Sequence, residues 1–493
     1  MSQLRVAIDL GAGSGRAVVG GISEGRVRLR EVHRFEYPAR QRDGHLRWDA
    51  EALFGGLRRG LRAAGTMAAT EGADLASVGV DSWAVDYGLL DARGRLLEEP
   101  VCYRDPRTDG VPDDVLRIVP RAELFARTGN HVLKLNTLYQ LVAHGRDGFP
   151  AGAVRLLMVP DLCHHFLCAS QTGEYTNATT TQLLNAQTGQ WDEDLVQRLG
   201  LPRALLPEVL PAGQRLGRLQ PARAAELDLP ELEVIAPATH DTASAVAGTP
   251  LQPGWAYISS GTWSLVGVER EAPLLGAAVG EANFTNEGGP YGTMRLLKNV
   301  MGLWLLESCR REWAAAGNVQ TLDELLLSVA AVDGFPGFVY PDALRFFSPA
   351  SMLCELRRAL GETGQPAPED PALVAKVVLD SLALRYASVV CALEKLTGRA
   401  VAGIHIVGGG SQNDYLNQAT ANAADRPVLA GPQEATAAGN FLVQSIAAGA
   451  VASLEEGRQL LGRSLPTRRF EPRAARAWAA VAPRYRELEM AAC

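Results

Sequence analysis

Hydrophobic and polar positions along this chain follow two different periods, and each period predicts a different kind of element. Apolar residues at a helical spacing predict helices over residues 50–72, 371–396 and 473–490. Short apolar runs that end in glycines or small polar residues predict buried strands over residues 4–10, 78–87, 256–260 and 404–407. The apolar run 296–307 predicts one more helix, with Lys298 and Asn299 as polar exceptions at its start.

The first strand ends in Asp9, and a segment rich in glycine follows it. Gly11, Gly13 and Gly15 do not have the spacing of a dinucleotide fingerprint, and strands rather than a helix are predicted after them. A P-loop is excluded because no lysine in the chain follows a glycine. Two interpretations remain: a β-hairpin whose tip binds phosphate through backbone N–H groups, and a glycine-rich hairpin without a ligand.

A similar pattern returns about halfway along the chain. Residues 256–266 again predict a strand, a turn of small hydroxyl residues that contains Thr262, and a second strand. The segment Thr249–Gly254 breaks the chain before it, so we expect a domain boundary there. A duplicated fold with one phosphate-binding turn in each half would hold a nucleotide between the halves.

The segment 239–242, Thr-His-Asp-Thr, contains the candidate chemistry. It follows a predicted strand end and precedes a run of small residues with helical character. A carboxylate at such a junction can face a ligand, which makes Asp241 a candidate general base. Aspartate is also a good helix cap, so the alternative is that Asp241 only caps the helix.

Composition and charge narrow the class of protein. The 493 residues are enough for two or more domains, and the net charge of -7 gives no basic surface for nucleic acid or membranes. We expect a cytoplasmic protein without a leader or a membrane span, and with its seven cysteines reduced. The His and Cys residues of segment 161–168 form one compact group without a second half, which favours an ordinary helix over a zinc site.

Several motifs, taken in order along nearly the whole chain, resemble the FGGY family of carbohydrate kinases. They are Asp9-Leu-Gly-Ala-x-Ser-Gly-Arg16, Asp81-x-Trp83, Tyr103-Arg-Asp105, Glu174-Tyr-Thr-Asn-Ala-Thr179, Thr239-His-Asp-Thr-Ala-Ser-Ala-Val246, Ser260-Gly-Thr-Trp-Ser264, Leu297-Lys-Asn299 and Gly408-Gly-Gly410. The His-Asp-Thr-Ala-Ser form is similar to the branch of that family that acts on L-rhamnulose.

The resemblance implies an actin-like (ribonuclease H-like), two-lobed α/β fold with the active site in the interdomain cleft. We expect an N-terminal lobe over 1–249, a C-terminal lobe over 250–450 and a helical extension over 451–493. The implied reaction moves the γ-phosphate of ATP to the 1-hydroxyl of L-rhamnulose, with ATP and Mg²⁺ as cofactors. The implied partners are ATP and a sugar, without nucleic acid or membrane, in a monomer or small homo-oligomer.

The resemblance also implies roles for single residues. The implied ATP contacts are Ala12, Gly13, Ser14, Gly15, Arg16, Thr262, Glu307 and Gly409. The implied sugar contacts are Ala84, His240, Asp241, Thr242 and Asn299. Asp241 is the implied base, and we expect Asp9 to hold Mg²⁺ through water.

Two positions depart from the family pattern. Ala84 replaces a glycine that contacts the sugar, and Glu307 replaces a glutamine near ATP, where its charge would repel phosphate unless it meets Arg310 or Arg311. The alternatives are therefore a kinase for another ketose, such as L-fuculose or D-xylulose, and an inactive actin-like protein that binds ATP.

Overall fold

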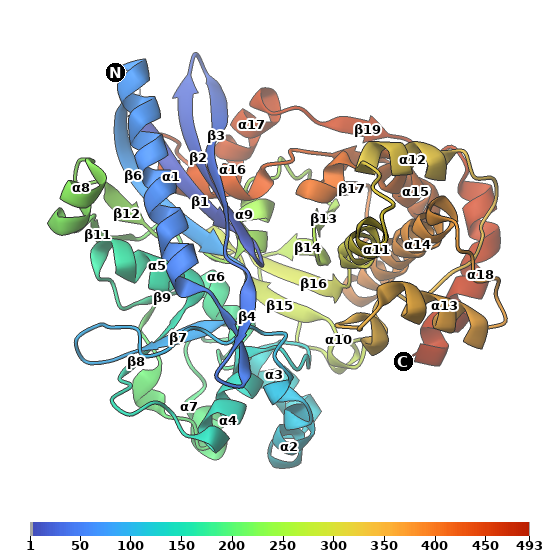
Figure 1. Ribbon diagram of the computed structural model, residues 1–493, viewed down its shortest axis with the longest axis horizontal. Coiled ribbons are helices and arrows are strands. Elements are labelled where there is room, and N and C mark those ends of the chain that lie inside the picture. Colours follow the sequence, from blue (N-terminus) through green and yellow to red (C-terminus); the bar gives the residue numbers. More distant parts are fainter. Residues whose placement is uncertain (1–2, 493) are drawn as a thin grey trace. The chain divides into compact units, whose positions relative to one another are not determined.

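The computed structural model describes residues 3–492 and divides the chain into two compact units (Figure 1). Unit 1 consists of Met1–Pro250, Glu269–Leu296 and Ala435–Leu465, and unit 2 of Leu251–Val268, Leu297–Glu434 and Pro466–Cys493. The first segment of unit 1 ends at Pro250. Two later segments also belong to unit 1, so the chain crosses between the units several times.

The principal elements of unit 1 are β1 (Gln3–Leu10), β2 (Ser14–Ser23), β3 (Arg26–Glu36), α1 (Ala50–Glu71), β6 (Asp74–Ser82), β7 (Tyr87–Leu90), α2 (Val111–Ile118), α3 (Arg121–Thr128), α4 (Thr137–Asp147), β8 (Arg155–Met158), α5 (Val159–Cys168), α6 (Tyr175–Ala178), α7 (Glu193–Arg198), β11 (Arg215–Arg218), α8 (Pro221–Leu227), β12 (Glu233–Ile235), α9 (Asp241–Ala247), β15 (Thr285–Gly288), α16 (Ala435–Ala447) and α17 (Leu454–Ser464). Six of these strands form a sheet in the order β11-β12-β6-β1-β2-β3. Strands β12, β6 and β1 run parallel, so their carboxyl ends meet at one edge.

Helices cover both faces of this sheet because side chains of neighbouring strand residues point to opposite faces. A Cβ atom at Gly60 of α1 would lie 3.8 Å from Ile8, whereas Ala7 packs with Ala437 of α16. Helix α1 follows its sequence signals closely. The Asp49 side chain accepts from the Ala52 N–H at its start, and Gly72 ends the helix in the left-handed conformation.

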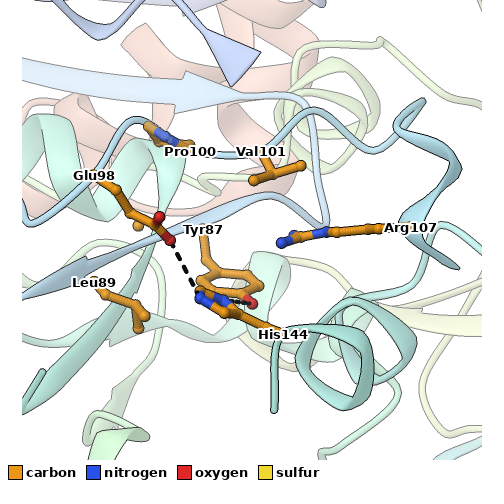
Figure 2. A pocket seen from close by; sticks show the side chains of 8 residues that line it. Tyr87, Leu89, Glu98, Pro100, Val101, Arg107 and His144 are labelled. Carbon is orange, nitrogen blue, oxygen red and sulfur yellow. Dashed lines mark hydrogen bonds and ion pairs between the residues drawn. The ribbon is translucent and has the colours of Figure 1, made fainter. Parts of the chain in front are cut away.

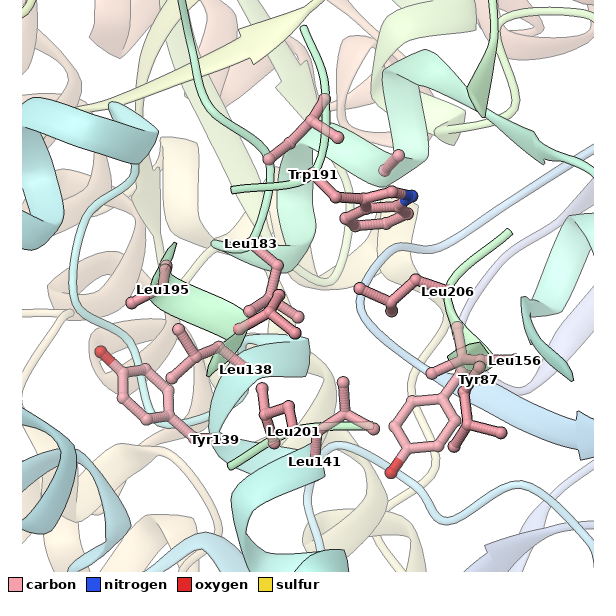
Figure 3. Packing of buried hydrophobic residues seen from close by; sticks show 14 of the residues in the cluster. Tyr87, Leu138, Tyr139, Leu141, Leu156, Leu183, Trp191, Leu195, Leu201 and Leu206 are labelled. Carbon is pink, nitrogen blue, oxygen red and sulfur yellow. The ribbon is translucent and has the colours of Figure 1, made fainter. Parts of the chain in front are cut away.

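One hydrophobic cluster of unit 1 includes residues of α2, α4 and α7 (Figure 3). Leu138 and Tyr139 of α4, Leu195 of α7 and Leu156 of β8 are all buried in it. Burying large apolar side chains contributes about 1.5–3 kcal/mol each, so this cluster supports strand β7, which begins at Tyr87, and the segment that contains Trp191.

The principal elements of unit 2 are β13 (Ala256–Ser260), β14 (Ser264–Arg270), β16 (Met294–Val300), α11 (Trp304–Ala315), α12 (Leu322–Ala330), α13 (Met352–Glu362), α14 (Pro371–Thr397), β17 (Ile404–Val407), α15 (Asp414–Ala424), β18 (Val428–Ala430), β19 (Arg468–Phe470) and α18 (Ala475–Ala492). The last residues of β14 and the first residues of β16 are assigned to unit 1. Strand β13 pairs antiparallel with β14 and parallel with β17, as β1 does with β2 and β6. Each unit therefore contains a hairpin beside a parallel third strand, which agrees with the predicted duplication.

The helix predicted over 296–307 is wrong in its first half. Strand β16 continues to Val300, and α11 begins only at Trp304. Gly302 lies against the β13–β14 hairpin, where a Cβ atom would overlap the Ser264 hydroxyl. The Leu303 N–H donates to the Gly261 carbonyl (3.0 Å) and the Trp304 N–H to that of Thr262 (3.2 Å), so the hairpin takes up the first N–H groups of the helix.

Candidate functional site

Three acidic residues meet at the carboxyl edge of the unit 1 sheet. Asp9 and Asp81 are direct partners in the parallel register of β1 and β6. The Ser82 N–H donates to the Thr239 carbonyl (2.8 Å), which holds the segment leading to Asp241 beside them. Burial raises the pKa of Asp81 well above its usual value, and the negative charge of Asp9 raises it further.

Asp241 is the first residue of α9, and its side chain keeps 31% of its surface exposed. The residue in the cap position is His240, and no side-chain cap hydrogen bond is present, so the capping interpretation of Asp241 is wrong. Loss of surrounding water raises the pKa of Asp241; the charge of His240 lowers it and that of Asp9 raises it. Asp241 is thus a reachable carboxylate with an enhanced affinity for a proton.

The β1–β2 hairpin presents polar backbone at its tip. Ala12 and Ser14 are exposed, and Gly13 has a φ of +118°, which an L side chain rarely adopts. The Tyr37 hydroxyl contacts the carbonyl oxygens of Gly11 and Ser14 from beneath.

Arg16 follows this tip and donates to Asp9 Oδ2 from Nε (2.8 Å) and Nη2 (2.6 Å). The guanidinium group of Arg16 therefore lies near the hairpin tip. Both offer hydrogen-bond donors suited to an anion such as phosphate.

The corresponding turn of unit 2 contains Thr262, which is exposed. A Cβ atom at Gly408 would lie 2.9 Å from the Ser260 carbonyl oxygen, so the triple glycine lies directly against this turn. Gly409, the middle residue of the triple glycine, is exposed, and a Cβ atom there would meet nothing within 4 Å. Two of the predicted nucleotide contacts of this unit, Thr262 and Gly409, therefore lie on adjoining turns, on backbone that a flat ligand can approach closely.

The remaining predicted contacts of unit 2 lie on either side of Gly302. Asn299 is half-buried near the end of β16. Glu307 lies on α11, and Arg310 Nη1 donates to both of its carboxylate oxygens at 2.9 Å. The charge of Glu307 is thus balanced by Arg310, one of the two arginines expected for this role.

Ala84 lies in a turn that is supported by the carboxylate of Asp86. The sequence did not identify Asp86 as a site residue. Asp86 is fully buried, and its Oδ2 accepts from the indole N–H groups of Trp48 (2.6 Å) and Trp83 (3.0 Å). Gln140 Nε2 donates to Asp86 Oδ1 (2.9 Å). Burial raises the pKa of Asp86 to about 6, despite these donors. Val85, between Ala84 and Asp86, has a φ of +71°, which is strained for a β-branched residue. This turn therefore keeps its shape only because the surrounding residues hold it.

Replacing Asp86 by alanine should leave two buried indole N–H groups without an acceptor. We expect the free energy of unfolding to fall by about 3 kcal/mol, because each unpaired buried donor costs about 1–3 kcal/mol. Urea unfolding of Asp86→Ala beside Asp74→Ala, which removes an exposed carboxylate from the same strand-turn unit, measures the difference. Equal stability of the two variants would contradict the anchoring role.

A shallow hollow close to this turn is lined by residues outside the predicted site (Figure 2). In it the Tyr87 hydroxyl lies 2.9 Å from His144 Nδ1, and His144 Nε2 lies 3.3 Å from Glu98 Oε1. Burial lowers the pKa of His144. The contact between Tyr87 and His144 joins β7 to α4.

The His240 segment also depends on residues that were not predicted as site residues. Glu174 Oε2 accepts from the N–H (2.9 Å) and hydroxyl (2.7 Å) of Thr239, and the His240 N–H donates to the Thr176 hydroxyl (3.1 Å). The motif Glu174-Tyr-Thr-Asn-Ala-Thr179 was the sequence signal for this support. Glu287 and Arg295, which contact the His240 ring, gave no sequence signal.

Residues 3–492 contain no cluster of three or more His, Cys, Asp or Glu side chains arranged to hold a metal ion directly. Within the same part of the chain, no helix has both the length and the apolar character to cross a membrane.

Comparisons with known proteins agree with this geometry. The models of the N-terminal and C-terminal domains of the FGGY family of carbohydrate kinases match residues 4–248 and 256–448. Rhamnulokinase of Bacteroides thetaiotaomicron is 40% identical over 97% of this chain and 98% of its own length. Rhamnulokinase of Pectobacterium carotovorum is 42% identical over 95% of this chain and 93% of its own.

The crystal structure of gluconate kinase from Lactobacillus acidophilus superposes with a TM-score of 0.81 at 15% identity, covering 100% of this chain and 98% of that one. The fold is therefore the actin-like, two-lobed α/β fold that the motifs imply. Both family domains, in order and over most of the chain, together with relatives at about 40% identity, show that the chain belongs to the FGGY family of carbohydrate kinases.

Proposed function

We propose that this kinase transfers the γ-phosphate of ATP to the 1-hydroxyl of L-rhamnulose, giving L-rhamnulose 1-phosphate and ADP. The relatives named rhamnulokinase, 37–42% identical along nearly their full lengths, support this choice of sugar. The observation that carries the chemistry is the half-exposed carboxylate of Asp241, at the start of α9 beside Asp9 and the hairpin tip.

In this mechanism Asp241 takes the proton of the 1-hydroxyl as that oxygen attacks the γ-phosphorus. The bond from phosphorus to the bridging oxygen breaks, and its electron pair leaves with ADP. A general base contributes about 10²–10⁴-fold, and the raised pKa of Asp241 brings it closer to the pH at which it works. Arg16 and the hairpin tip of residues 12–16 bind phosphate in unit 1. Thr262 and Gly409 form the corresponding nucleotide-binding turns of unit 2, where Arg310 balances the charge of Glu307.

The donor set fits Mg²⁺ bound together with ATP. Mg²⁺ keeps several waters and needs only one or two carboxylates from the protein. Asp9 would hold the ion through water, and the buried Oδ1 of Asp81, which has no hydrogen-bond partner in the described chain, faces the same group of acids. When bound, Mg²⁺ supplies counter-charge to the phosphates.

Sugar-dependent release of ADP tests this proposal. Purified protein with ATP and Mg²⁺ should release ADP fastest with L-rhamnulose, and more slowly with L-fuculose and D-xylulose. A higher kcat/KM for one of the other ketoses would reassign the substrate. Absence of sugar-dependent release with every ketose would favour an inactive protein that binds ATP.

The methyl group of Ala84 should narrow the sugar site. We expect Ala84→Gly to raise kcat/KM for the poorer ketoses relative to L-rhamnulose, by roughly tenfold, because one methyl group is worth about 1–3 kcal/mol in a pocket. Competition between pairs of ketoses measures this ratio directly. An unchanged ratio for Ala84→Gly would mean that residue 84 does not contact the sugar.

A further inference from the structure

The ring of His240, the residue before the proposed base, lies between two sets of charged groups. His240 is only 5% exposed. On one side, its Nε2 lies 3.4 Å from Asp241 Oδ1. On the other side, its Nδ1 lies 3.1 Å from Arg295 Nη2 and 3.4 Å from Glu287 Oε2. One edge of the ring therefore faces the reaction, and the other faces a pair of oppositely charged side chains.

This pair is deeply buried. Arg295 has no exposed surface and Glu287 keeps 4%. Arg295 Nη2 lies 3.3 Å from Glu287 Oε2 and, together with Nε, also donates to the Gly288 carbonyl. Burial alone would raise the pKa of Glu287, but hydrogen bonding with His240 and the charge of Arg295 lower it to about 2. A buried ion pair adds little net stability, so its position against His240 calls for a functional explanation.

The contacts restrict where the ring carries its proton. A neutral ring protonated on Nδ1 alone would turn that N–H toward the N–H of Arg295, which never loses its protons. The same ring would turn the bare lone pair of Nε2 toward the Asp241 carboxylate. Both repulsions disappear in the neutral ring that carries its proton on Nε2, because Nδ1 then accepts from Arg295.

A donor at Nε2 also distinguishes the two oxygens of the base. Asp241 Oδ1 faces His240 Nε2 and accepts from the Thr242 hydroxyl at 3.1 Å. Oδ2 is then the oxygen left to receive the proton of the sugar hydroxyl. The backbone of this segment is held separately by Glu174 and Thr176, so Glu287 and Arg295 act on the ring and not on the main chain.

We propose that Glu287 and Arg295 are positioning residues for phosphoryl transfer, which hold the His240 ring with Nε2–H directed at Asp241 Oδ1. This inference rests on the proposed function, in which Asp241 is the base and His240 contacts the sugar.

Replacing Glu287 by glutamine tests the inference by kinetics. We expect kcat/KM for the ketose to fall roughly tenfold to hundredfold, because small misplacements of reacting groups cost about that much, while KM for ATP stays unchanged. The matched control is Asp380→Asn, which breaks a similar buried ion pair with Lys376 in unit 2 and should lower the melting temperature without changing either constant. If the two variants have the same kinetics, the positioning role is overturned.

A measurement on the wild-type protein does not depend on the folding of a variant. The chain has eight histidines, so ¹⁵N-histidine labelling gives few ring signals, and His240→Gln assigns the one that matters. We expect a protonated Nε2 at neutral pH; an unprotonated Nε2 would overturn the inference. The proposed function itself fails only if wild-type protein shows no sugar-dependent ADP release, or if Asp241→Asn remains fully active.

Discussion

Replacing Asp241 by asparagine should reduce the rate of phosphoryl transfer to the ketose by at least about 10²-fold, with ATP binding unchanged. The amide keeps nearly the same shape and can still accept the Thr242 hydroxyl, but it cannot take a proton. Single-turnover transfer measures the first quantity and calorimetry with a non-hydrolysable ATP analogue measures the second.

The matched control for this variant is Asp228→Asn. Asp228 ends α8 in the left-handed conformation, which asparagine also tolerates, so this change removes one carboxylate from unit 1 without strain. Turnover of Asp241→Asn at the level of Asp228→Asn would remove residue 241 from the mechanism. Loss of ATP binding in Asp241→Asn would instead indicate that its carboxylate organises the nucleotide site.

The second large effect concerns the helix that carries the base. Helices α9 and α16 cross at Gly248 and Gly439, where a Cβ atom at residue 439 would overlap the Ser244 carbonyl oxygen and one at residue 248 would overlap that of Ala435. Both obstacles are backbone atoms, which cannot rotate away. We therefore expect Gly439→Ala to lower the free energy of unfolding by about 3 kcal/mol or more, and to reduce activity by shifting α9.

Gly361→Ala provides the comparison for this prediction. Gly361 also lies in a helix, α13, but a Cβ atom there would meet nothing within 4 Å. Alanine should stabilise that helix slightly, since glycine costs about 1 kcal/mol in a helix interior. Urea unfolding and the ketose assay on both variants separate close packing from a general effect of the substitution. Similar stability of the two variants would contradict the helix contact described here.

The elements with strong periodicity could be predicted from the sequence. The helices expected over 50–72, 371–396 and 473–490 are observed as α1, α14 and α18 within two residues at each end. The two hairpins were also predicted correctly, because each has turn residues between short apolar runs. Residues 296–307 failed because a continuous apolar run does not distinguish a buried strand from a helix, and the hairpin contacts of Gly302 determine where the strand ends.

The candidate site residues also differ in whether the local sequence indicates them. Asp241 could be proposed as a candidate base because its polar neighbours form one contiguous segment, and the structure excludes it as a cap. Asp86, Glu287 and Arg295 could not be found, because their importance comes from burial against segments that are distant in the sequence. A single carboxylate in a sequence carries no sign that two indoles or an imidazole will face it.

The shared carboxylate beneath Ala84 gives the protein an optical reporter. Trp48 and Trp83, two of its eight tryptophans, have ring centroids 4.7 Å apart and bond to the same oxygen of Asp86. Indole emission depends on the hydrogen bond and the polarity at the ring nitrogen, so any shift of this turn changes the fluorescence of both residues. Under the proposed function Ala84 contacts the sugar, so we expect sugar binding to change this fluorescence without a dye and without turnover.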